Sequence, residues 1–322
     1  MPLPTISDQH VDSYLTNLSV GWIQEPSNFV ASDAFANLPV DKKSDRIPLY
    51  NRGDLYRDEM QIRAPGTESA GGGYRVSRDT YLADVYATHI DVDEQTIAGA
   101  DNPYAPAEDA LRVVVQRERL KREVQFGTEA FATSIWTGGT SSDPSATTAF
   151  GAALDDPSSS PIEGFAEQAN SILVKTGFAP NALVLNNLGW ISLKNHPDVV
   201  DRVKHTSGAP VSMDIVARLL DLDNIYVSKA TRNTAAEGIT ASYSSILGNS
   251  ALLYYRNPSA GLWSPSAGYT FVWRGYPGST DGRRVKRFHL DKEAAWRIEG
   301  EAAFDIKSID ADLGCFITSV AS

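Results

Sequence analysis

The chain has 322 residues, of which 42% are hydrophobic and 21% charged, and its formal net charge is −11. This length supports one large core or two lobes, and we expect two lobes because cores tend to split beyond about 250 residues. The acidic balance argues against a protein that works by neutralising nucleic-acid phosphates, and no apolar run approaches the roughly 18 residues that span a bilayer.

Residues 1–41 predict an extended arm with short helical turns. Scattered apolar residues lie among Pro, Ser and Asn with little sustained period. Such an arm has too few apolar residues to fold alone, so it needs a host surface in its own chain or in a neighbour. No Lys or Arg precedes Lys42. The basic start of a secretory signal is therefore lacking, and we expect the chain to stay in the cytoplasm.

Residues 47–94 predict a long hairpin because apolar and polar side chains alternate along them. The outgoing strand spans are 47–52 and 55–64, and the return runs over 74–94. Between them lie Pro65 and the triplet Gly71–Gly73. The triplet lacks the Lys-Ser/Thr and the helix start of a phosphate loop, so we interpret it as a mobile tip.

Residues 106–136 give the strongest helical signal. Pro106 suits a first helical position and Gly138 a stop. At 1.5 Å per residue this helix would be about 46 Å long, so it should lie like a beam across other elements. Its apolar stripe would consist of Leu120, Val124, Phe131 and Ile135.

The segment 138–161 is rich in Gly, Ser, Thr, Asp and Pro, which predicts a loop and an internal boundary. An α+β run follows. Its helices are expected at 162–176, 187–204 and 212–221, and its strands at 182–185, 224–228, 250–256, 268–275, 294–307 and 313–320.

No set of side chains in the sequence forms a known catalytic or metal-binding pattern. The histidines lack metal spacing such as HExxH, so each is expected at the surface or at a helix cap: His10, His89, His196, His205 and His289. A solvated strand edge explains the carboxylates of Asp91, Asp93 and Glu94 as well as a metal site does.

The possible nucleophiles also lack context. Ser250 follows Gly248-Asn249 inside a strand run, without the strand-turn-helix of a nucleophile elbow. Cys315 is the only cysteine and is expected to act as a small core hydrophobe. We expect pairing with acids, rather than DNA recognition, for the one dense basic run, Arg283, Arg284, Lys286, Arg287 and Lys292.

The stretch "ALVLNNLGWISLKNHPDVVDRVKH", residues 182–205, runs from a buried strand through polar residues into a helix. Nucleotide sites and nucleophile elbows share this outline, but the chemistry that either requires is missing. We therefore interpret the stretch as scaffold. Trp190 and Leu193 lie three residues apart on one helical face, and both are expected to be buried.

The order of an arm, a long hairpin, a beam helix and a two-part α+β body resembles the major capsid protein of tailed bacteriophages, the Hong Kong 97 phage-type fold. At residue level the resemblance is carried by "FAPNALVLNNLGWISLKNH", "EVQFGTEAFATSIWTG" and the region from "SALLYYRNPSAG" to "FVWRGYPG". The resemblance implies the following organisation: an N-terminal arm (1–41), an E-loop hairpin (42–94), a spine helix (104–136) with part of the P-domain (95–179), an A-domain (180–283) and P-domain return strands (284–322).

The resemblance also implies a structural protein without catalytic, cofactor or metal residues. It would self-assemble through pentamers and hexamers into an icosahedral shell, and enclose double-stranded DNA without sequence-specific binding. Assembly in the host cytoplasm and procapsid maturation would precede its place in the virion capsid. Only about a hundred residues precede the spine helix, which implies a separate scaffolding protein; a portal and a decoration protein are further partners of this class.

Two alternatives remain at this point. An encapsulin, a bacterial cargo compartment of the same fold, would look alike in sequence. An α+β hydrolase would require a Ser, His and Asp set that we cannot assemble from these residues.

Overall fold

The computed structural model describes residues 23–100, 105–204, 211–257, 259, 263–279 and 281–321. Its helices are α1 (Ala31–Ala34), α2 (Arg52–Leu55), α3 (Glu94–Ala98), α4 (Pro106–Glu129), α5 (Ala146–Phe150), α6 (Pro161–Thr176), α7 (Asn187–Asn195), α8 (Pro197–Lys204) and α9 (Met213–Leu219), with 3-10 turns η2 (Pro26–Asn28) and η3 (Ala311–Leu313). Its strands are β1 (Ala36–Val40), β2 (Ser44–Tyr50), β3 (Val76–Leu82), β4 (Asp84–Asp93), β5 (Ala182–Asn186), β6 (Asn224–Ser228), β7 (Thr231–Asn233), β8 (Tyr243–Ser245), β9 (Ser250–Tyr254), β10 (Gly268–Trp273), β11 (Arg283–Leu290), β12 (Ala295–Ser308) and β13 (Gly314–Thr318).

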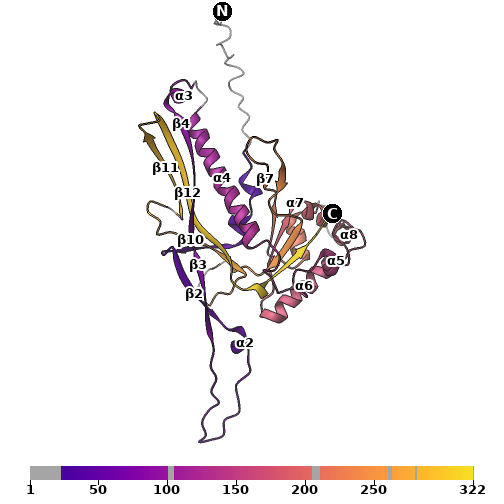
Figure 1. Cartoon of the computed structure of the whole chain (residues 1–322). Coiled ribbons are helices and arrows are strands. Elements are labelled where there is room, and N and C mark those ends of the chain that lie inside the picture. Colours follow the sequence, from indigo (N-terminus) through magenta and orange to yellow (C-terminus); the bar gives the residue numbers. More distant parts are fainter. Residues whose placement is uncertain are drawn as a thin grey trace, which may run out of the picture.

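The first sheet has five strands in the order β1-β10-β12-β11, and β4 also pairs with β12. The long helix α4 lies along this sheet (Figure 1). Ala110 and Val114 are buried on the helix, and Gly300 of β12 lies beneath Val114, where a Cβ would collide with the valine side chain. The sheet and the helix therefore approach each other closely because position 300 has no side chain.

Helix α4 begins at Pro106 as predicted but ends at Glu129, seven residues before the predicted end. Its buried positions are Pro106, Ala110, Val114, Arg122, Glu123 and Phe126, so the predicted stripe is wrong. Leu120 and Val124 are only half-buried. The chain leaves the helix because the indole N–H of Trp136 donates to the carbonyl of Ala130 at 2.7 Å, which fixes a turn around that carbonyl.

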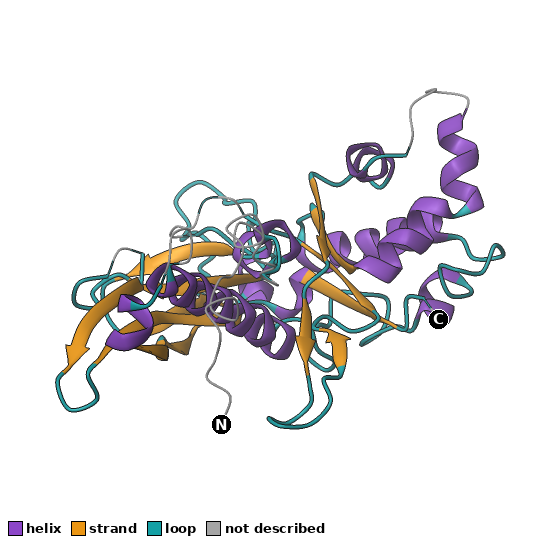
Figure 2. Cartoon of the chain, turned by 90° about the horizontal axis from the view of Figure 1, so that it is seen from above, coloured by secondary structure: helices purple, strands orange, loops and turns teal. Residues whose placement is uncertain are grey.

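The second sheet has the order β13-β9-β5-β6, and every residue of β5 is buried. Helices α5 to α9 lie on this side of the molecule, which forms a second part beside the first sheet in the view from above (Figure 2). The segment 138–161, predicted as a loop, contains α5. Phe150 and Leu154 are buried in the core of this part, so the segment packs against the body rather than acting as a loose linker.

A two-stranded hairpin, β2 with β3, projects from the body, and its connecting loop extends farther still (Figure 1). The hairpin prediction is confirmed, with shorter strands than expected: Ser44 pairs with Leu82 and Tyr50 with Val76. The predicted strand at 55–64 is wrong, because Asn51 caps the short helix α2 by accepting from the N–H of Asp54. The return strand also divides, and its second half, β4, joins β12 instead.

The two sheets meet in one aromatic cluster. Phe35 makes edge-to-face contacts with Phe126 (5.4 Å between ring centroids), Tyr254 (5.7 Å) and Trp136 (6.5 Å). These rings come from the N-terminal arm, α4, the turn after α4 and β9, so one core holds both sheets. The described part of the arm thus finds its host surface in its own chain.

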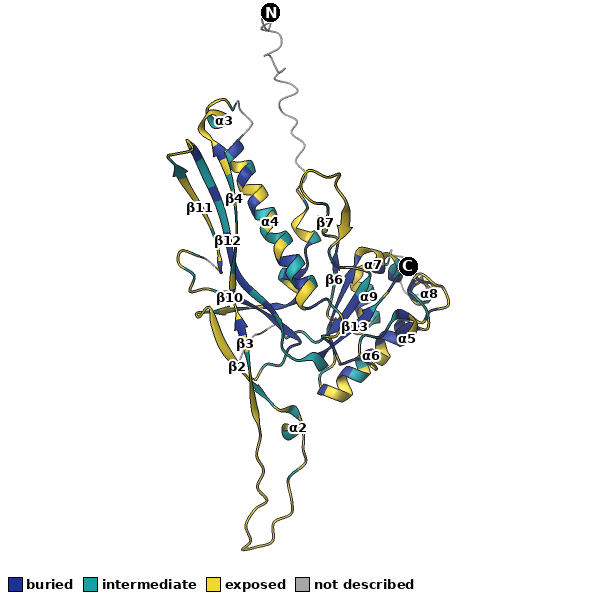
Figure 3. Ribbon diagram, in the orientation of Figure 1, coloured by how far each residue is buried: buried dark blue, intermediate teal, exposed yellow. Residues whose placement is uncertain are grey.

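The remaining element predictions are largely confirmed, including α6, β5, α7 to α9, β6, β9, β10, β12 and β13. Leu193 is fully buried as predicted, but Trp190 is only half-buried at the edge of the second core. Exposed residues concentrate on the hairpin loop and on β11 (Figure 3). Among the described residues, no helix is long and apolar enough to cross a bilayer.

Replacing Trp136 with Ala should lower the free energy of unfolding by about 3 to 5 kcal/mol, the usual loss for a deleted core aromatic. Trp136 is 1% exposed, and Gly314 packs so closely on its indole that the cavity cannot easily collapse. Trp190→Ala is the matched control and should cost clearly less. Chemical denaturation of both variants measures the difference, and equal losses would show that the aromatic cluster is not the main core.

Candidate functional site

The histidines that the structure describes serve structural roles. His196 is buried, and its Nδ1 accepts from the N–H of Asp198 at 3.2 Å, which caps α8; its Nε2 lies 3.0 Å from Ser159 Oγ. His89 is exposed. His10 and His205 lie outside the described residues. The expectation of capping therefore holds for His196, although this residue is not at the surface.

His289 lies between two carboxylates, 2.8 Å from Glu94 Oε1 and 2.7 Å from Asp291 Oδ1. These contacts raise the pKa of His289, first through the hydrogen bond that the imidazolium donates to Asp291. Asp91 accepts two hydrogen bonds from Arg297, and Asp93 caps α3. The three clustered carboxylates thus have three different partners. Within the described ranges, no three His, Cys, Asp or Glu side chains are arranged to hold a metal ion.

The two candidate nucleophiles lie in the second sheet. Ser250 is the first residue of β9, and strand rather than a turn follows it. Cys315 lies in β13 with 1% exposure, and burial raises the pKa of its thiol to about 12. A thiol with such a pKa stays protonated at neutral pH, so its thiolate is not available for attack.

Arg283, Arg284 and Lys286 of the basic run pair with acids, as predicted, and Arg287 lies over an aromatic ring instead. Arg283 Nε lies 2.7 Å from Glu118 Oε1 of α4, and Arg284 pairs with Glu301. Lys286 Nζ is 3.4 Å from the same Glu301, and the guanidinium of Arg287 lies 4.5 Å from the ring centroid of Trp296. These contacts attach β11 to its neighbours.

The sequence gives no hint of a buried carboxylate on α4 that joins three segments. Glu123 is fully buried, and its Oε2 accepts from the backbone N–H groups of Val30 (3.0 Å) and Ala31 (2.8 Å). Its Oε1 accepts from Ser228 Oγ at 2.8 Å, at the end of β6. Burial raises the pKa of Glu123, and the hydrogen bonds from Ala31, Ser228 and Val30 lower it only in part. No sequence motif indicates this role, because its partners are distant in sequence.

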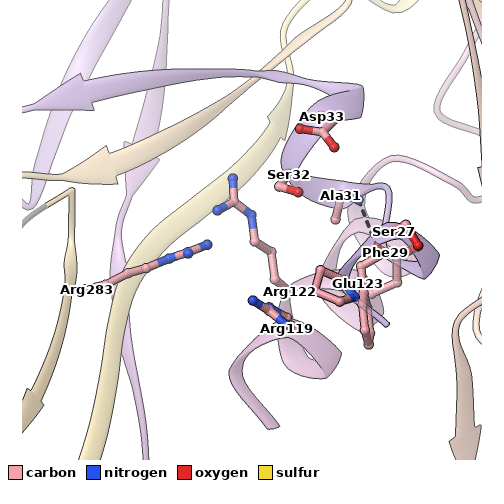
Figure 4. A pocket seen from close by; sticks show the side chains of 10 residues that line it. Ser27, Phe29, Ala31, Ser32, Asp33, Arg119, Arg122, Glu123 and Arg283 are labelled. Atoms are coloured by element: carbon pink, nitrogen blue, oxygen red, sulfur yellow. Dashed lines mark hydrogen bonds between the residues drawn. The ribbon is translucent and has the colours of Figure 1, made fainter. Parts of the chain in front are cut away.

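Next to Glu123 lies a pocket of about 360 Å³ between the arm, α4 and β11 (Figure 4). Its lining residues are Pro26, Ser27, Phe29, Ala31, Ser32, Asp33, Arg119, Arg122, Glu123 and Arg283. Arg122 is 6% exposed and hydrogen-bonds Asn37 of β1. Burial and then the nearby Arg283 lower the pKa of Arg122 to about 10.

The paired strands of the projecting hairpin contact the body along their length, from Tyr81, which stacks on Phe271, to Arg52 and Tyr56 beyond the last strand pair. Arg52 pairs with Asp310 and Asp312 beside η3, and the hydroxyl of Tyr56 donates to the carbonyl of Thr176 at 2.6 Å. Beyond these contacts lie apolar side chains open to solvent: Met60 is 94% exposed and Ile62 is completely exposed.

Solved structures define the fold of the chain. The chain has the capsid fold of the Hong Kong 97 phage type: the capsid structure of cyanophage P-SCSP1u matches with a TM-score of 0.60 and 11% identity, covering 98% of this chain and 94% of that one. A phage-related protein of Bordetella bronchiseptica RB50 matches with a TM-score of 0.67 and 19% identity, over 92% of this chain and 94% of that one.

A sequence relative makes the likeness more particular. The major capsid protein of Burkholderia phage BcepMu is 25% identical over 275 residues, which cover 83% of this chain and 85% of the relative. No family model matches the chain. The resemblance to phage major capsid proteins is thus confirmed. The name of this relative favours a structural role over the hydrolase alternative.

The encapsulin alternative shares the fold. The encapsulin complex of Synechococcus elongatus PCC 7942 matches with a TM-score of 0.55 and 10% identity, covering 99% of this chain and 96% of that one. At this identity the match reports the fold alone, and the sequence relative is a phage protein.

Glu123→Gln should leave the free energy of unfolding within about 1 kcal/mol of wild type, because the amide oxygen can accept from both backbone N–H groups and the amide NH₂ can donate to Ser228. Glu123→Leu should cost about 2 to 6 kcal/mol, since two buried N–H groups lose their acceptor at about 1 to 3 kcal/mol each. Exposed Glu129→Leu on the same helix is the control. Equal effects of Gln and Leu, measured by denaturation, would contradict this role.

The raised pKa of Glu123 fixes the sign of a pH effect. The folded state binds the proton of the Glu123 carboxyl group more tightly than the unfolded state does. The stability that this protonation adds is therefore complete below the ordinary pKa of 4.5, and it is lost as the pH rises through the pKa of the folded state. Glu123→Gln cannot ionise there. Relative to wild type, its melting temperature should therefore rise between pH 4 and neutral pH. A difference that stays constant over this range would show that Glu123 titrates normally.

Proposed function

We propose that this chain is the subunit of an icosahedral shell that encloses the double-stranded DNA genome of a tailed phage. The subunits would first form pentamers and hexamers, which then close the shell. The observation that carries the proposal is the projecting hairpin with exposed apolar side chains, in a chain whose fold is that of phage capsids. The finished protein would reside in the virion capsid.

The division into parts follows the same proposal. The hairpin (42–94, without β4, which pairs with β12) would serve contacts between subunits, whereas the described part of the N-terminal arm (1–41) packs on its own body. Helix α4 would be the spine of a P-domain made from 95–179 and 284–322. Strands β5, β6 and β9 of the second sheet, with α7 to α9, would form the A-domain (180–283) around the axis of each ring. Strand β13 pairs with β9 and joins this sheet from outside that range.

The hairpin would lie over a neighbouring subunit. A two-stranded ribbon is marginal in water when nothing covers it, and the loop between α2 and β3 has no regular structure of its own. Met60 and Ile62 find no cover in the described part of their own chain. A neighbour that buries both would gain roughly 25 cal/mol for each Å² of apolar surface removed from water.

The charge balance fits a container for DNA. With 40 acidic and 29 Lys or Arg residues, the subunit offers few sites that would hold phosphates tightly. A weakly interacting wall lets the genome move during packaging and release. The basic run on β11 is engaged with Glu118, Glu301 and Trp296 in the same chain.

Other partners follow from the proposed assembly. A separate scaffolding protein, a portal and a decoration protein would act with this chain during assembly in the host cytoplasm. The encapsulin alternative predicts particles that hold a protein cargo. The contents of particles from infected or induced cells, DNA or cargo protein, decide between the two.

Met60→Ser combined with Ile62→Ser should abolish closed particles while leaving the folded subunit intact, because these side chains touch nothing within the described body. The expected change in the free energy of unfolding is within about 0.5 kcal/mol. Sedimentation measures the assembled fraction, and thermal unfolding measures the subunit. A chain lacking residues 61–74 should behave in the same way.

Glu68→Gln is the matched control, since it changes an exposed side chain of the same loop without removing apolar surface. Its particles should be normal. If the double Ser variant also builds normal particles, the hairpin does not provide the proposed contact.

A further inference from the structure

The pocket beside Glu123 carries more positive than available negative charge. Three guanidinium groups line it, from Arg119, Arg122 and Arg283, against the carboxylates of Asp33 and Glu123. Glu123 is occupied by two backbone N–H groups and Ser228. Arg283 is paired with Glu118. Asp33 is thus the one lining carboxylate without a hydrogen bond or ion pair among the described residues.

Arg122 is the group that most needs a partner. It is more than nine-tenths buried, yet among the described residues its one hydrogen-bond partner is the neutral amide of Asn37, and its Nε has none. A buried cation with an unsatisfied N–H group is costly, because it has lost its hydration without replacement. Arg119, three residues earlier on the same helix, makes no ion pair in the described part of the chain.

The shape of the pocket limits what can satisfy Arg122. Its guanidinium lies within the pocket, below Ser32 and near Arg283 (Figure 4). A carboxylate on a flexible side chain can enter a recess of about 360 Å³ and meet the planar N–H groups of arginine in pairs. A phosphate within a DNA duplex is flanked by sugars and by the second strand, and reaches a recessed group less easily.

We propose that this pocket is a binding site for a carboxylate side chain that another protein chain presents. Within the assembly proposed above, on which this part of the inference rests, that chain is a neighbouring copy. Each copy has 40 acidic and 29 Lys or Arg residues, so copies brought together have surplus carboxylates and few free cations. A cationic recess between the arm, α4 and β11 would bind one acidic side chain specifically. Electrostatic complementarity of this kind fixes the register between two subunits and the choice of partner.

The first test uses the full-length chain and succinate as a probe for carboxylates, with inorganic phosphate as the competing probe, at constant ionic strength. Succinate should raise the melting temperature of wild type. In Arg119→Gln combined with Arg283→Gln, which leaves buried Arg122 in place, the affinity should fall about tenfold, as expected for lost charge-assisted hydrogen bonds.

Arg112→Gln combined with Arg117→Gln is the matched control, because it removes two exposed positive charges from the same helix. This variant should bind succinate like wild type. No succinate effect on wild type, an equal loss in both double variants, or a stronger response to phosphate than to succinate would each overturn the assignment to carboxylates.

The second test distinguishes carboxylate binding in the pocket from the claim that a neighbouring copy supplies the carboxylate. In a reconstruction of assembled particles, a carboxylate of a neighbouring copy should lie within hydrogen-bond distance of Arg122 or Arg119. Particles in which another molecule or solvent fills the pocket would overturn the assignment to a neighbouring copy. Succinate binding by a chain that forms no particles would instead support the pocket and contradict the proposed function.

Discussion

The carboxylate of Glu123 joins three segments that are distant in the sequence, and the junction of the two sheets depends on it. The residues whose groups donate to it, Val30, Ala31 and Ser228, are separated from it by 93, 92 and 105 positions. Buried backbone N–H groups without an acceptor are costly, so other placements of the arm against α4 are disfavoured. The aromatic rings of Phe35, Phe126 and Tyr254 hold the same arm against α4 and β9.

The molecule has two parts that differ mechanically: a rigid body around Glu123, and a hairpin whose loop is exposed. The body holds its arm through Glu123 and the rings of Phe35, Phe126 and Tyr254. The paired strands of the hairpin contact the body as far as Arg52 and Tyr56, and the loop beyond them exposes Met60 and Ile62. In the proposed shell, identical bodies would keep their shape while hairpins adapt to neighbours at slightly different angles. The pocket lined by Arg119, Arg122 and Arg283 lies on the rigid body, which suits a contact that would fix the register between subunits.

Elements with a strong local signal could be predicted from the sequence, and elements fixed by distant partners could not. The apolar run of β5 and the capped, amphipathic α6 are examples of the first kind. The end of α4 is of the second kind, since residues 130–136 continue the helical pattern while Trp136 is drawn into the core. The same holds for the site: charged residues are ordinarily exposed, and only the fold reveals why Arg122 and Glu123 are buried.

The central claim is that this chain forms a closed shell in which each hairpin covers a neighbour. Electron cryomicroscopy of the purified, full-length chain, with and without the proposed scaffolding protein, tests it most directly. The account predicts icosahedral particles with fivefold and sixfold rings, and Met60 and Ile62 buried against the adjacent subunit. A chain that remains monomeric under all salt and scaffold conditions, or particles whose hairpins face solvent, would contradict it.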